Sequence, residues 1–370
     1  MIKFLALLGP ALLVLTQPAP PVAWQSVAPG VEHAHIVRAT PWSIHVLRID
    51  PSLAVLDVFH ARDNAVGLER VSELAARQNA IAAINGGYFR MTGTFAGDST
   101  GTLQIDGKIL SEPDRGRAAV GLVRTRQGTR LIMGHVAWQG SVKAGDTTRR
   151  LDGLNRARGA NELVLFTPEF NDTTLTDATG SEALVRDGRV VEIRDGAGST
   201  PIPRDGFVLS ATGTAAAWLR SALTAGTRVT AAVGLEPVDD LPRNPWRDAE
   251  DILGGGPKLV TAGRIDITGE REKVAPAFVT DRHPRSAIAS LADGRVLLLV
   301  VDGRQPELSL GMSLDELARV LVELGAVEAI NLDGGGSTTM VVKGGIINHP
   351  SDPTGERPVS DAIIVRSRPQ

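Results

Sequence analysis

The sequence has 370 residues, of which 42% are hydrophobic and 22% are charged, a composition typical of a globular protein with a sizeable core. Its net charge of −3, with basic residues scattered along the chain, gives no electrostatic basis for binding nucleic acid or an anionic membrane. The chain contains no cysteine, which excludes disulfides, thiol catalysis and zinc sites built on cysteine.

Residues 1–23 are expected to form a secretory signal peptide. Lys3 supplies a positive start, and residues 4–15 form an apolar segment that, at about 12 residues, is too short to span a bilayer. Small residues then offer cleavage near Ala19 or Ala23, and a buried N-terminal helix is the alternative. The signal predicts a protein that is secreted or located in the periplasm or cell envelope. No later segment is long and apolar enough to predict a membrane span.

The rest of the chain alternates short strands with tight turns. Hairpins are predicted over 103–110, 184–191, 257–267, 288–301 and 340–347, with turns at Asp106-Gly107, Asp187-Gly188, Ala262-Gly263, Asp293-Gly294 and Gly344-Gly345. Asp-Gly is favoured at such turns because a type I′ turn needs positive φ at both central residues. Helices are predicted over 68–78, 212–223 and 314–324, the last opened by a capping box at Ser313. We therefore predict an α+β fold with a mostly antiparallel or mixed β-sheet core, rich in hairpins, with a few flanking helices.

Two glycine-containing segments are the first candidates for function. Asn85, Gly86 and Gly87 follow an apolar strand, which places an amide where backbone can approach a ligand closely, although Asn-Gly is also an ordinary turn signal. Gly254, Gly255 and Gly256 could form an anion-binding nest of N–H groups or a tight connection between strands. The following Pro257, and the lack of a Lys-Ser/Thr pair, exclude a nucleotide-binding P-loop.

Charged residues flank two later strands. Arg282 and Arg285 precede an apolar strand, where guanidinium groups could grip a phosphate through paired hydrogen bonds or simply lie in solvent at a sheet edge. His283 between them could be a base or a metal ligand, although a lone histidine before proline is more often neither. Asp302 ends the uninterrupted apolar run 297–301, a placement that catalytic acids commonly have.

The segment from Asn331 to Ser337 carries the strongest functional signal. Asn331 and Asp333 would point to the same face of an extended strand, because side chains alternate along it. Three consecutive glycines cost backbone entropy, and close approach to a substrate is the usual compensation. The hydroxyls of Ser337 and Thr338 follow directly.

Together these segments resemble the phosphodiester glycosidase family over about residues 80–366. The matching motifs are Asn85-Gly86-x-Tyr88-Phe89, Gly254-Gly255-Gly256-Pro257, Arg282-x-Pro284-Arg285-Ser286, Val301-Asp302-Gly303-Arg304 and Asn331-x-Asp333-Gly334-Gly335-Gly336-Ser337-Thr338-Thr339. Residues 24–79 are expected to contain N-terminal strands and a helix leading into the core, and the resemblance implies that residues 80–368 form the catalytic domain. Asp361 departs from the family, which usually has asparagine there.

The resemblance implies an exported hydrolase that cleaves the glycosidic C–O bond of sugar 1-phosphodiesters, releasing free sugar and a phosphomonoester. For that reaction we expect Asp333 to act as base or nucleophile and Asp302 as its partner, with the reverse assignment open. Whether the reaction retains or inverts configuration would depend on the distance between the two carboxyl groups. The expected substrate-binding residues are Asn85, Gly86, Arg282, Arg285, Asn331, Gly334, Gly335, Ser337 and Thr338, with the loop Gly254, Gly255 and Gly256.

Two other functions stay open from the sequence. A divalent-metal-dependent phosphoesterase could use Asp302, Asp333 and His283 or His349 on magnesium, manganese or calcium, cutting P–O instead of C–O. A non-enzymatic glycan-binding domain would need aromatic platforms, and the chain offers five Trp and one Tyr. The favoured mechanism requires no cofactor, although calcium or magnesium remains an alternative. The expected partner is a sugar 1-phosphodiester or a phosphate-containing glycan, and the sequence does not predict an oligomeric state.

Overall fold

The computed structural model describes residues 22–114, 116–239 and 243–368. The predicted signal peptide therefore lies outside the described residues, apart from its last two positions. Within the described ranges, no helix combines the length and the apolar character needed to cross a membrane.

Four β-sheets make up most of the structure, as expected for the predicted α+β fold. The eight-stranded sheet has the order β1 (Gln25–Ala28), β2 (Val31–Arg38), β3 (Trp42–Ile49), β21 (Val296–Val301), β20 (Arg285–Leu291), β22 (Ala326–Asn331), β18 (Lys258–Thr261) and β19 (Arg264–Ile265). One five-stranded sheet has the order β24 (Gly345–Ile346), β23 (Met340–Val342), β5 (Ala82–Asn85), β25 (Asp361–Ser367) and β4 (Ala54–His60). Its central strands bring the Asn85 segment and the chain's last strand together.

The other two sheets extend the molecule to one side. The seven-stranded sheet has the order β10 (Thr147–Arg150), β9 (Gly128–Ala144), β8 (Ala118–Thr125), β17 (Asp251–Gly254), β6 (Leu103–Ile105) and β7 (Lys108–Ser111), with β16 (Val229–Pro237) also paired to β9. The second five-stranded sheet has the order β11 (Gly153–Leu154), β12 (Leu163–Phe166), β15 (Gly206–Ala211), β13 (Ser181–Arg186) and β14 (Arg189–Asp195). Among the described strand pairs, β11 with β12 is the one parallel pair, so the prediction of a mostly antiparallel core is confirmed.

Helices are few and cover sheet faces. They are α1 (Val71–Arg77), α2 (Gly213–Ala222), α3 (Pro276–Thr280) and α4 (Leu314–Glu323), with 3₁₀ turns η1 (Ala61–Asp63), η2 (Pro245–Asp248) and η3 (Gly335–Ser337). The capping box predicted for α4 is confirmed, because the Ser313 side chain accepts a hydrogen bond from the Glu316 N–H at 3.2 Å. The sequence did not predict α3.

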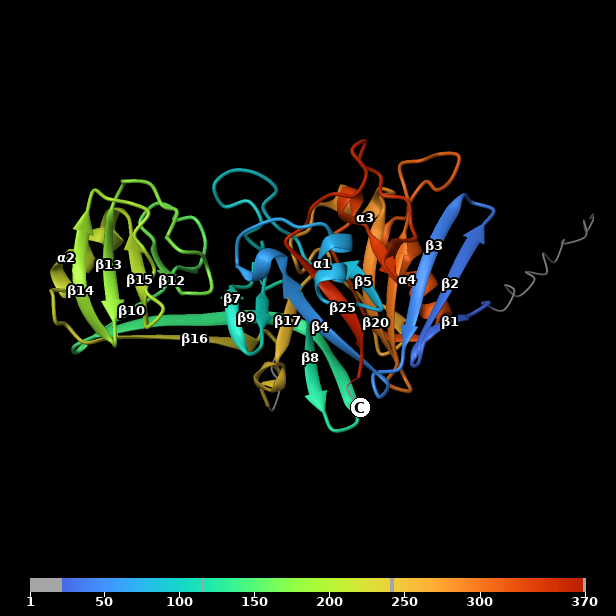
Figure 1. Ribbon diagram of the computed structural model, residues 1–370, viewed down its shortest axis with the longest axis horizontal. Helices are drawn as coiled ribbons and strands as arrows, with labels where there is room; N and C mark the ends of the chain where they lie inside the picture. The colour runs from blue at the N-terminus through green and yellow to red at the C-terminus, as the bar shows by residue number, and fades with distance from the viewer. Residues whose placement is uncertain (1–21, 115, 240–242, 369–370) are drawn as a thin grey trace, which may run out of the picture.

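The long strands β9 and β16 form an arm that joins two lobes (Figure 1). They pair from Val136 opposite Pro237 to Ala144 opposite Val229. Beyond the arm, β11 to β15 and α2 surround a separate apolar cluster that includes Leu165, Leu209 and Leu219. Residues 80–368 were expected to form one domain, and the second lobe was not predicted from the sequence. The N-terminal strands, in turn, belong to the main sheet, because β3 lies between β2 and β21.

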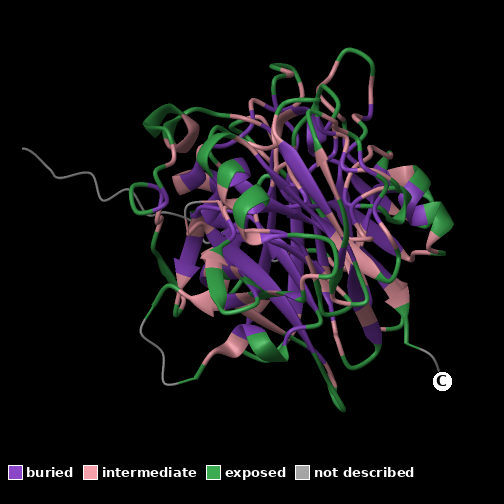
Figure 2. Ribbon diagram, turned by 90° about the vertical axis from the view of Figure 1, so that its left-hand side faces the viewer, coloured by how far each residue is buried: buried purple, intermediate pink, exposed green. Residues whose placement is uncertain are grey.

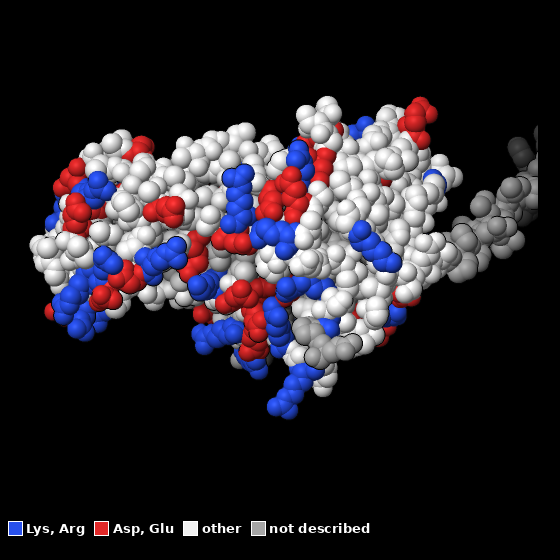
Figure 3. Space-filling model, viewed as in Figure 1, with Lys and Arg blue, Asp and Glu red and all other residues white. Residues whose placement is uncertain are grey.

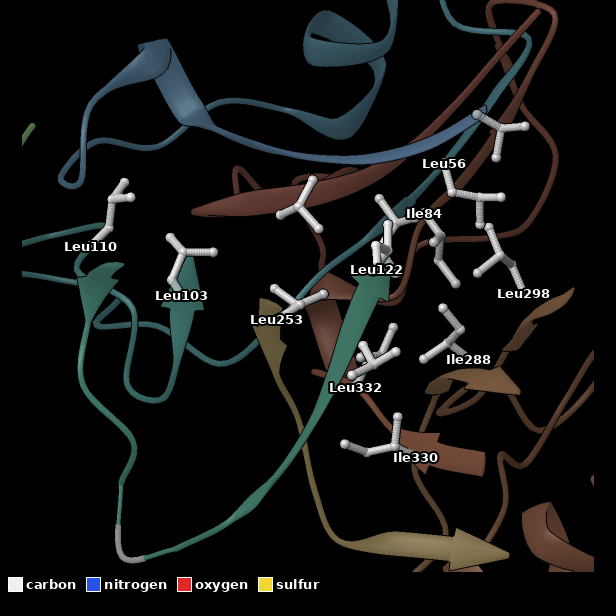
Figure 4. Close-up of a cluster of buried hydrophobic side chains, with 14 of the residues drawn as sticks. Leu56, Ile84, Leu103, Leu110, Leu122, Leu253, Ile288, Leu298, Ile330 and Leu332 are labelled. Carbon is white, nitrogen blue, oxygen red and sulfur yellow. The ribbon is translucent and has the colours of Figure 1, made fainter. Parts of the chain in front are cut away.

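The main core lies between the eight-stranded sheet and the sheets facing it. In Figure 4, Ile288, Leu298 and Ile330 of the eight-stranded sheet lie near Ile84 and Leu122 of two other sheets. Full burial of one such side chain contributes roughly 1.5–3 kcal/mol to folding. Helix α4 packs on the opposite face of the eight-stranded sheet through an apolar stripe, Leu314, Leu317 and Leu321. Figure 2 shows the buried strands in the middle and exposed loops around them.

The five predicted hairpins all form, with two differences at the turns. Asp106-Gly107, Asp187-Gly188 and Ala262-Gly263 have positive φ at both residues, as a type I′ turn requires. At Asp293-Gly294 only the glycine has positive φ (86°), so that turn is of another type. The last hairpin turns at Lys343 and Gly344, one residue earlier than predicted, because Gly345 already pairs with Val342.

Candidate active site

The ends of several strands meet where the candidate site lies. Asp333, just after β22, donates its N–H to the carbonyl of Gly86, just after β5, at 3.1 Å. Leu332 donates its N–H to Ser286 O at 2.9 Å, which extends the β20–β22 pairing past the end of β22. The Gly256 N–H, between β17 and β18, donates to Asn331 O at 2.7 Å. Segments far apart in the sequence thus surround Asp333.

Asp333 is a partly exposed residue whose carboxyl group is withdrawn from solvent and has a raised pKa. Its Oδ1 accepts the N–H of Gly334 at 2.9 Å, and its carboxyl also bonds the Ser337 side chain. Withdrawal from solvent raises the pKa of Asp333, and the carboxylate of Asp361 also raises it. The two hydrogen bonds and the charge of Arg357 lower it, and the net pKa is about 6. At neutral pH the group is mostly ionised and can accept a proton, as a general base must.

Tyr88 and Asn331 form a fixed pair next to Asp333. The Tyr88 hydroxyl donates to Gly256 O at 2.7 Å and accepts from Asn331 Nδ2 at 2.7 Å. Burial raises the pKa of Tyr88, and the charge of Asp333 raises it further, so the phenol keeps its proton. Asn331 Oδ1 is buried and accepts no hydrogen bond within the part of the chain that the structure describes. The site residues expected from the sequence did not include Tyr88, although the Asn-Gly-x-Tyr motif contains it.

The amide oxygen and nitrogen of the Asn85 side chain both form hydrogen bonds within the protein. Its Nδ2 donates to Asp333 O at 2.7 Å, and its Oδ1 accepts from Ser286 Oγ at 2.7 Å and from the Thr339 N–H at 3.2 Å. The side chain is fully buried. This geometry favours a role in positioning Asp333 over the expected contact with a sugar hydroxyl.

The predicted anion nest at Gly254, Gly255 and Gly256 is not formed. Their N–H groups donate to carbonyls of the protein: Gly254 to Thr102 O at 2.6 Å, Gly255 to Ala118 O at 3.0 Å, and Gly256 to Asn331 O at 2.7 Å. A Cβ at Gly255 would lie 2.6 Å from Asn331 O. The glycines therefore let β17 and β18 approach neighbouring backbone, which is the tight-connection alternative left open from the sequence.

The structure separates the two arginines that the sequence placed together. Arg282 is 42% exposed and pairs with Glu316 on α4. Arg285 is 1% exposed, donating from Nε to Met312 O and from Nη2 to Phe278 O and Asp281 O, each at 2.8 Å. Burial, together with the charge of Arg304, lowers the pKa of Arg285 to about 10, which leaves the guanidinium protonated at neutral pH. Of the two, only Arg285 lies next to the Asp333 segment.

The Asp302 carboxylate is hydrogen-bonded within the protein on both of its oxygens. Its Oδ2 accepts from Ser43 Oγ at 2.8 Å, and its Oδ1 accepts the His349 N–H at 2.7 Å and Asn348 Nδ2 at 3.2 Å. Val301 lies opposite Arg285 in the sheet, so alternation places the next residue, Asp302, on the other face. Asp333 lies two residues beyond the end of β22, where Asn331 is opposite Ala287. The geometry thus favours a positioning role for Asp302 in place of the expected catalytic partnership.

Substitution of Asp302 distinguishes these roles. Asp302→Asn is expected to retain activity within about tenfold of wild type, because an amide oxygen still accepts the His349 N–H and the Ser43 hydroxyl can rotate to accept. Asp302→Ala leaves buried donors unpaired and is expected to lower the free energy of unfolding by about 3 kcal/mol. Turnover assays and urea unfolding measure the two effects. A loss of turnover of about a thousandfold in a folded Asp302→Asn protein is the size expected for a missing acid or base. That result would support Asp302 as the catalytic partner of Asp333.

The other predicted site residues lie in or under the loop after Asp333. Gly86 and Gly334 are tightly packed, because a Cβ would lie 2.0 Å from Asp361 Oδ1 and 2.7 Å from Pro284 O, respectively. Gly335 has φ +61° and is partly exposed. Ser337 is buried and bonds Asp333. Thr338 is also buried, and its Oγ1 has no partner among the described residues.

The side chains required for a metal-dependent phosphoesterase do not converge. His349 approaches Asp302, with 3.4 Å between Nδ1 and Oδ2, whereas His283 lies with Arg285 and Arg304. In the described part of the chain, no group of three or more His, Asp or Glu side chains is arranged to hold a metal ion. A cavity of about 770 Å³ lies at the opposite end of β20 and β21, lined by residues 290–295 among others. It does not include Asp333.

Comparisons with known proteins show which family the chain is similar to. The phosphodiester glycosidase family model matches residues 179–366, just over half of the chain, so Asp333 lies inside the match and Asn85 before it. The N-acetylglucosamine-1-phosphodiester alpha-N-acetylglucosaminidase of Bos taurus is 35% identical over 136 residues, covering 34% of this chain and 25% of that protein. The chain thus aligns with about a quarter of the length of that mammalian relative.

Two solved structures share most of the fold. A protein from Burkholderia pseudomallei has a TM-score of 0.77 and 29% identity, covering 88% of this chain and 74% of that one. A protein from Synechocystis has a TM-score of 0.80 and 25% identity, covering 95% of this chain and 64% of that one. The family match covers the segment that contains Asp333, Arg285 and Arg304. The chain therefore belongs to the phosphodiester glycosidase family.

Proposed function

We propose that this protein is an exported hydrolase that cleaves the glycosidic C–O bond of sugar 1-phosphodiesters, with N-acetylglucosamine 1-phosphodiesters as the first class to test. The single observation that carries the proposal is Asp333, a partly exposed residue at the junction of four strand ends whose carboxyl group has a pKa raised to about 6. Family membership and the name of the mammalian relative support the substrate class. The apolar segment within residues 1–23 supports export.

In the proposed reaction, Asp333 takes a proton from water as the water oxygen bonds to the sugar C1. The bond between C1 and the phosphate oxygen breaks, and its electron pair leaves with the phosphomonoester. A phosphomonoester is a good leaving group, so the reaction needs a base more than it needs an acid. Asn331 Oδ1, which lacks a donor among the described residues, would accept a hydrogen bond from a sugar hydroxyl or amide.

The neighbouring carboxyl groups favour a single displacement with inversion at C1. A retaining enzyme needs a second acid–base group that activates water after the nucleophile has bonded to the sugar. Asp302 and Asp361 are both 1% exposed and accept hydrogen bonds on each carboxylate oxygen, and Asp352 is paired with Arg357. Because Asp302 and Asp361 are buried and Asp352 is ion-paired, the proposal assigns water, and not Asp333, as the nucleophile.

The test uses N-acetyl-α-glucosamine 1-(methyl phosphate) in water enriched in oxygen-18. C–O cleavage gives free sugar carrying the label and methyl phosphate without it, whereas P–O cleavage puts the label in the phosphorus product. Proton NMR during the first turnovers reports the anomer released, and we expect the β-anomer. Release of sugar 1-phosphate would refute the proposed reaction and favour a phosphoesterase. Binding without release of any product would favour a glycan-binding domain.

Asp361 offers a test of the electrostatics at Asp333. Its buried carboxylate raises the pKa of Asp333, so Asp361→Asn is expected to move the acidic limb of the kcat/KM profile, which lies near pH 6 in the wild type, to lower pH. The asparagine oxygen can still accept the Gly87 N–H. Asp205→Asn, on the exposed surface of the second lobe, is the matched control. A limb that stays in place or moves upward in Asp361→Asn contradicts the prediction.

A further inference from the structure

We propose that Arg304 and Arg285 together form a phosphate subsite beside Asp333, with Arg304 as the solvent-facing half. The binding of phosphate at this subsite is independent of the proposed function. That the bound phosphate is the leaving group of the reaction rests on the proposed function. Arg304 was not among the site residues expected from the sequence, and Arg282, which was, lies elsewhere.

Arg304 is held over the loop that follows Asp333. Its Nη2 and Nη1 lie 3.0 and 3.3 Å from the point where a Cβ on Gly335 would be, so the guanidinium rests against the Gly335 backbone. The preceding Gly303 fits closely against Pro284 and Gly311, because a Cβ there would lie within 2.9 Å of both. Arg304 itself has φ +60°, a left-handed conformation that non-glycine residues adopt at a cost of order 1 kcal/mol.

The Arg304 guanidinium is exposed and unpaired. It makes no hydrogen bond or ion pair with any residue of the described ranges 22–114, 116–239 and 243–368. Its neighbour Arg285 is bound by three backbone carbonyls and by no carboxylate within those ranges. Arg285 Nη1 likewise donates no hydrogen bond to the described residues. Both guanidinium groups therefore keep hydrogen-bonding capacity that the described residues do not use.

These two positive charges lie close enough to affect each other. Burial lowers the pKa of His283, and the charges of Arg285 and Arg304 lower it further, so both guanidinium groups act on the same imidazole. The charge of Arg304 lowers the pKa of Arg285, and the charge of Asp281 offsets part of this effect. Bringing like charges together costs free energy that a bound anion recovers, and guanidinium groups match the oxygens of a phosphate through paired hydrogen bonds. A phosphate held by Arg304 would lie near Gly335, two residues after the proposed base.

Arg282, which lies between α3 and β20, differs from Arg285 and Arg304 in having an acidic partner. It pairs with Glu316 at the N-terminal end of α4, so its charge is already neutralised within the protein. On the face drawn in Figure 3, basic and acidic side chains likewise lie next to each other, without an extended basic surface. Arg304 therefore differs from Arg282 in having no ion-pair partner among the described residues.

The test compares Arg304→Asn with Arg282→Asn in the full-length protein. Asparagine tolerates the left-handed conformation of Arg304 and removes the guanidinium, so the variant is expected to fold. Inorganic phosphate is the probe, titrated by calorimetry without substrate and then used as an inhibitor of turnover. We expect Arg304→Asn to weaken phosphate binding by about tenfold to a hundredfold, the loss typical of a hydrogen bond to a charged group. Arg282→Asn should stay within about twofold of wild type, because it removes only an exposed ion pair.

Arg304→Lys separates charge from geometry. Lysine keeps the charge but donates from a single point, so intermediate phosphate affinity is expected. Unchanged phosphate affinity in Arg304→Asn, or an equal loss in Arg282→Asn, would overturn the proposed subsite. If the wild type binds phosphate through Arg304 but releases no sugar, the subsite stands and the proposed function fails. If the wild type releases sugar and Arg304→Asn changes neither phosphate inhibition nor KM, the function stands and the subsite fails.

Discussion

Asp333→Asn is expected to lower the rate of sugar release by about 10²–10⁴-fold, the range typical of a missing general base. The asparagine keeps the size of the side chain and an oxygen that can accept the Gly334 N–H. It cannot take the proton of the attacking water. Because the acidic limb of the wild-type profile is assigned to this group, the residual activity of the variant should no longer fall as pH drops through about 6. Steady-state kinetics on a methyl or aryl sugar 1-phosphodiester measure both effects.

The same substitution is expected to stabilise the folded protein at neutral pH. The folded-state pKa of Asp333 is raised from 3.8 to about 6, so the folded protein holds this proton more tightly than the unfolded chain. The contribution of Asp333 to the free energy of unfolding therefore falls as pH rises between these values. Above about pH 6 the full destabilising effect of the ionised group is present. Asn removes the charge, so the gain in unfolding free energy is expected to reach at most about 3 kcal/mol above pH 7 and to vanish below about pH 4.

Asp302→Asn is the matched control for both measurements, since it alters a buried carboxyl group that the structure bonds to Ser43, His349 and Asn348. Denaturant unfolding at two pH values measures the stability difference. A folded Asp333→Asn protein with near wild-type turnover removes Asp333 from the mechanism. Loss of turnover together with lowered stability at neutral pH would instead indicate a structural role for Asp333.

Features that depend on local sequence were predictable. Asp106-Gly107 and Asp187-Gly188 mark hairpins because few residue pairs accept positive φ at two successive positions. Ser313 marks the start of α4 because its side chain satisfies a free N–H three residues later. The alternation of side chains along a strand is equally local, and it predicts that Asn331 and Asp333 share one face. α3 was missed because five residues opening with a proline show no helical period.

Features that depend on distant partners were not predictable. The second lobe exists because β9 pairs with β16, strands separated by the whole lobe. Arg282 and Arg285 look equivalent in the sequence, and only the position of Glu316 on α4 decides that Arg282 points away from the site. Asp302 resembles a catalytic acid until Ser43, on a strand near the other end of the chain, is seen to bond its carboxylate. Sequence patterns identify chemically capable residues, whereas distant contacts decide which of them are free to react.

Asn85→Ala is expected to reduce both stability and turnover, which tests whether Asn85 holds the site together or contacts the sugar. The change leaves the Ser286 hydroxyl and the Thr339 N–H without their acceptor and removes the donor to Asp333 O. Each buried group left unpaired costs about 1–3 kcal/mol, so the free energy of unfolding should fall by about 3 kcal/mol or more. The segment carrying Asp333 then loses its link to β5, so kcat should fall with little change in KM.

Ser286→Ala is the graded control for this prediction. It removes one donor to Asn85 Oδ1 and keeps the Thr339 N–H bond, so its cost should be near 1 kcal/mol. Urea unfolding of the two variants, beside their kcat and KM, gives the comparison. If Asn85 binds a sugar hydroxyl instead, Asn85→Ala would raise KM while its unfolding free energy stays near that of Ser286→Ala. If Asn85 positions Asp333, kcat should fall together with stability while KM stays nearly constant. The reason is that the hydrogen bonds of the Asn85 side chain are made to Asp333, Ser286 and Thr339.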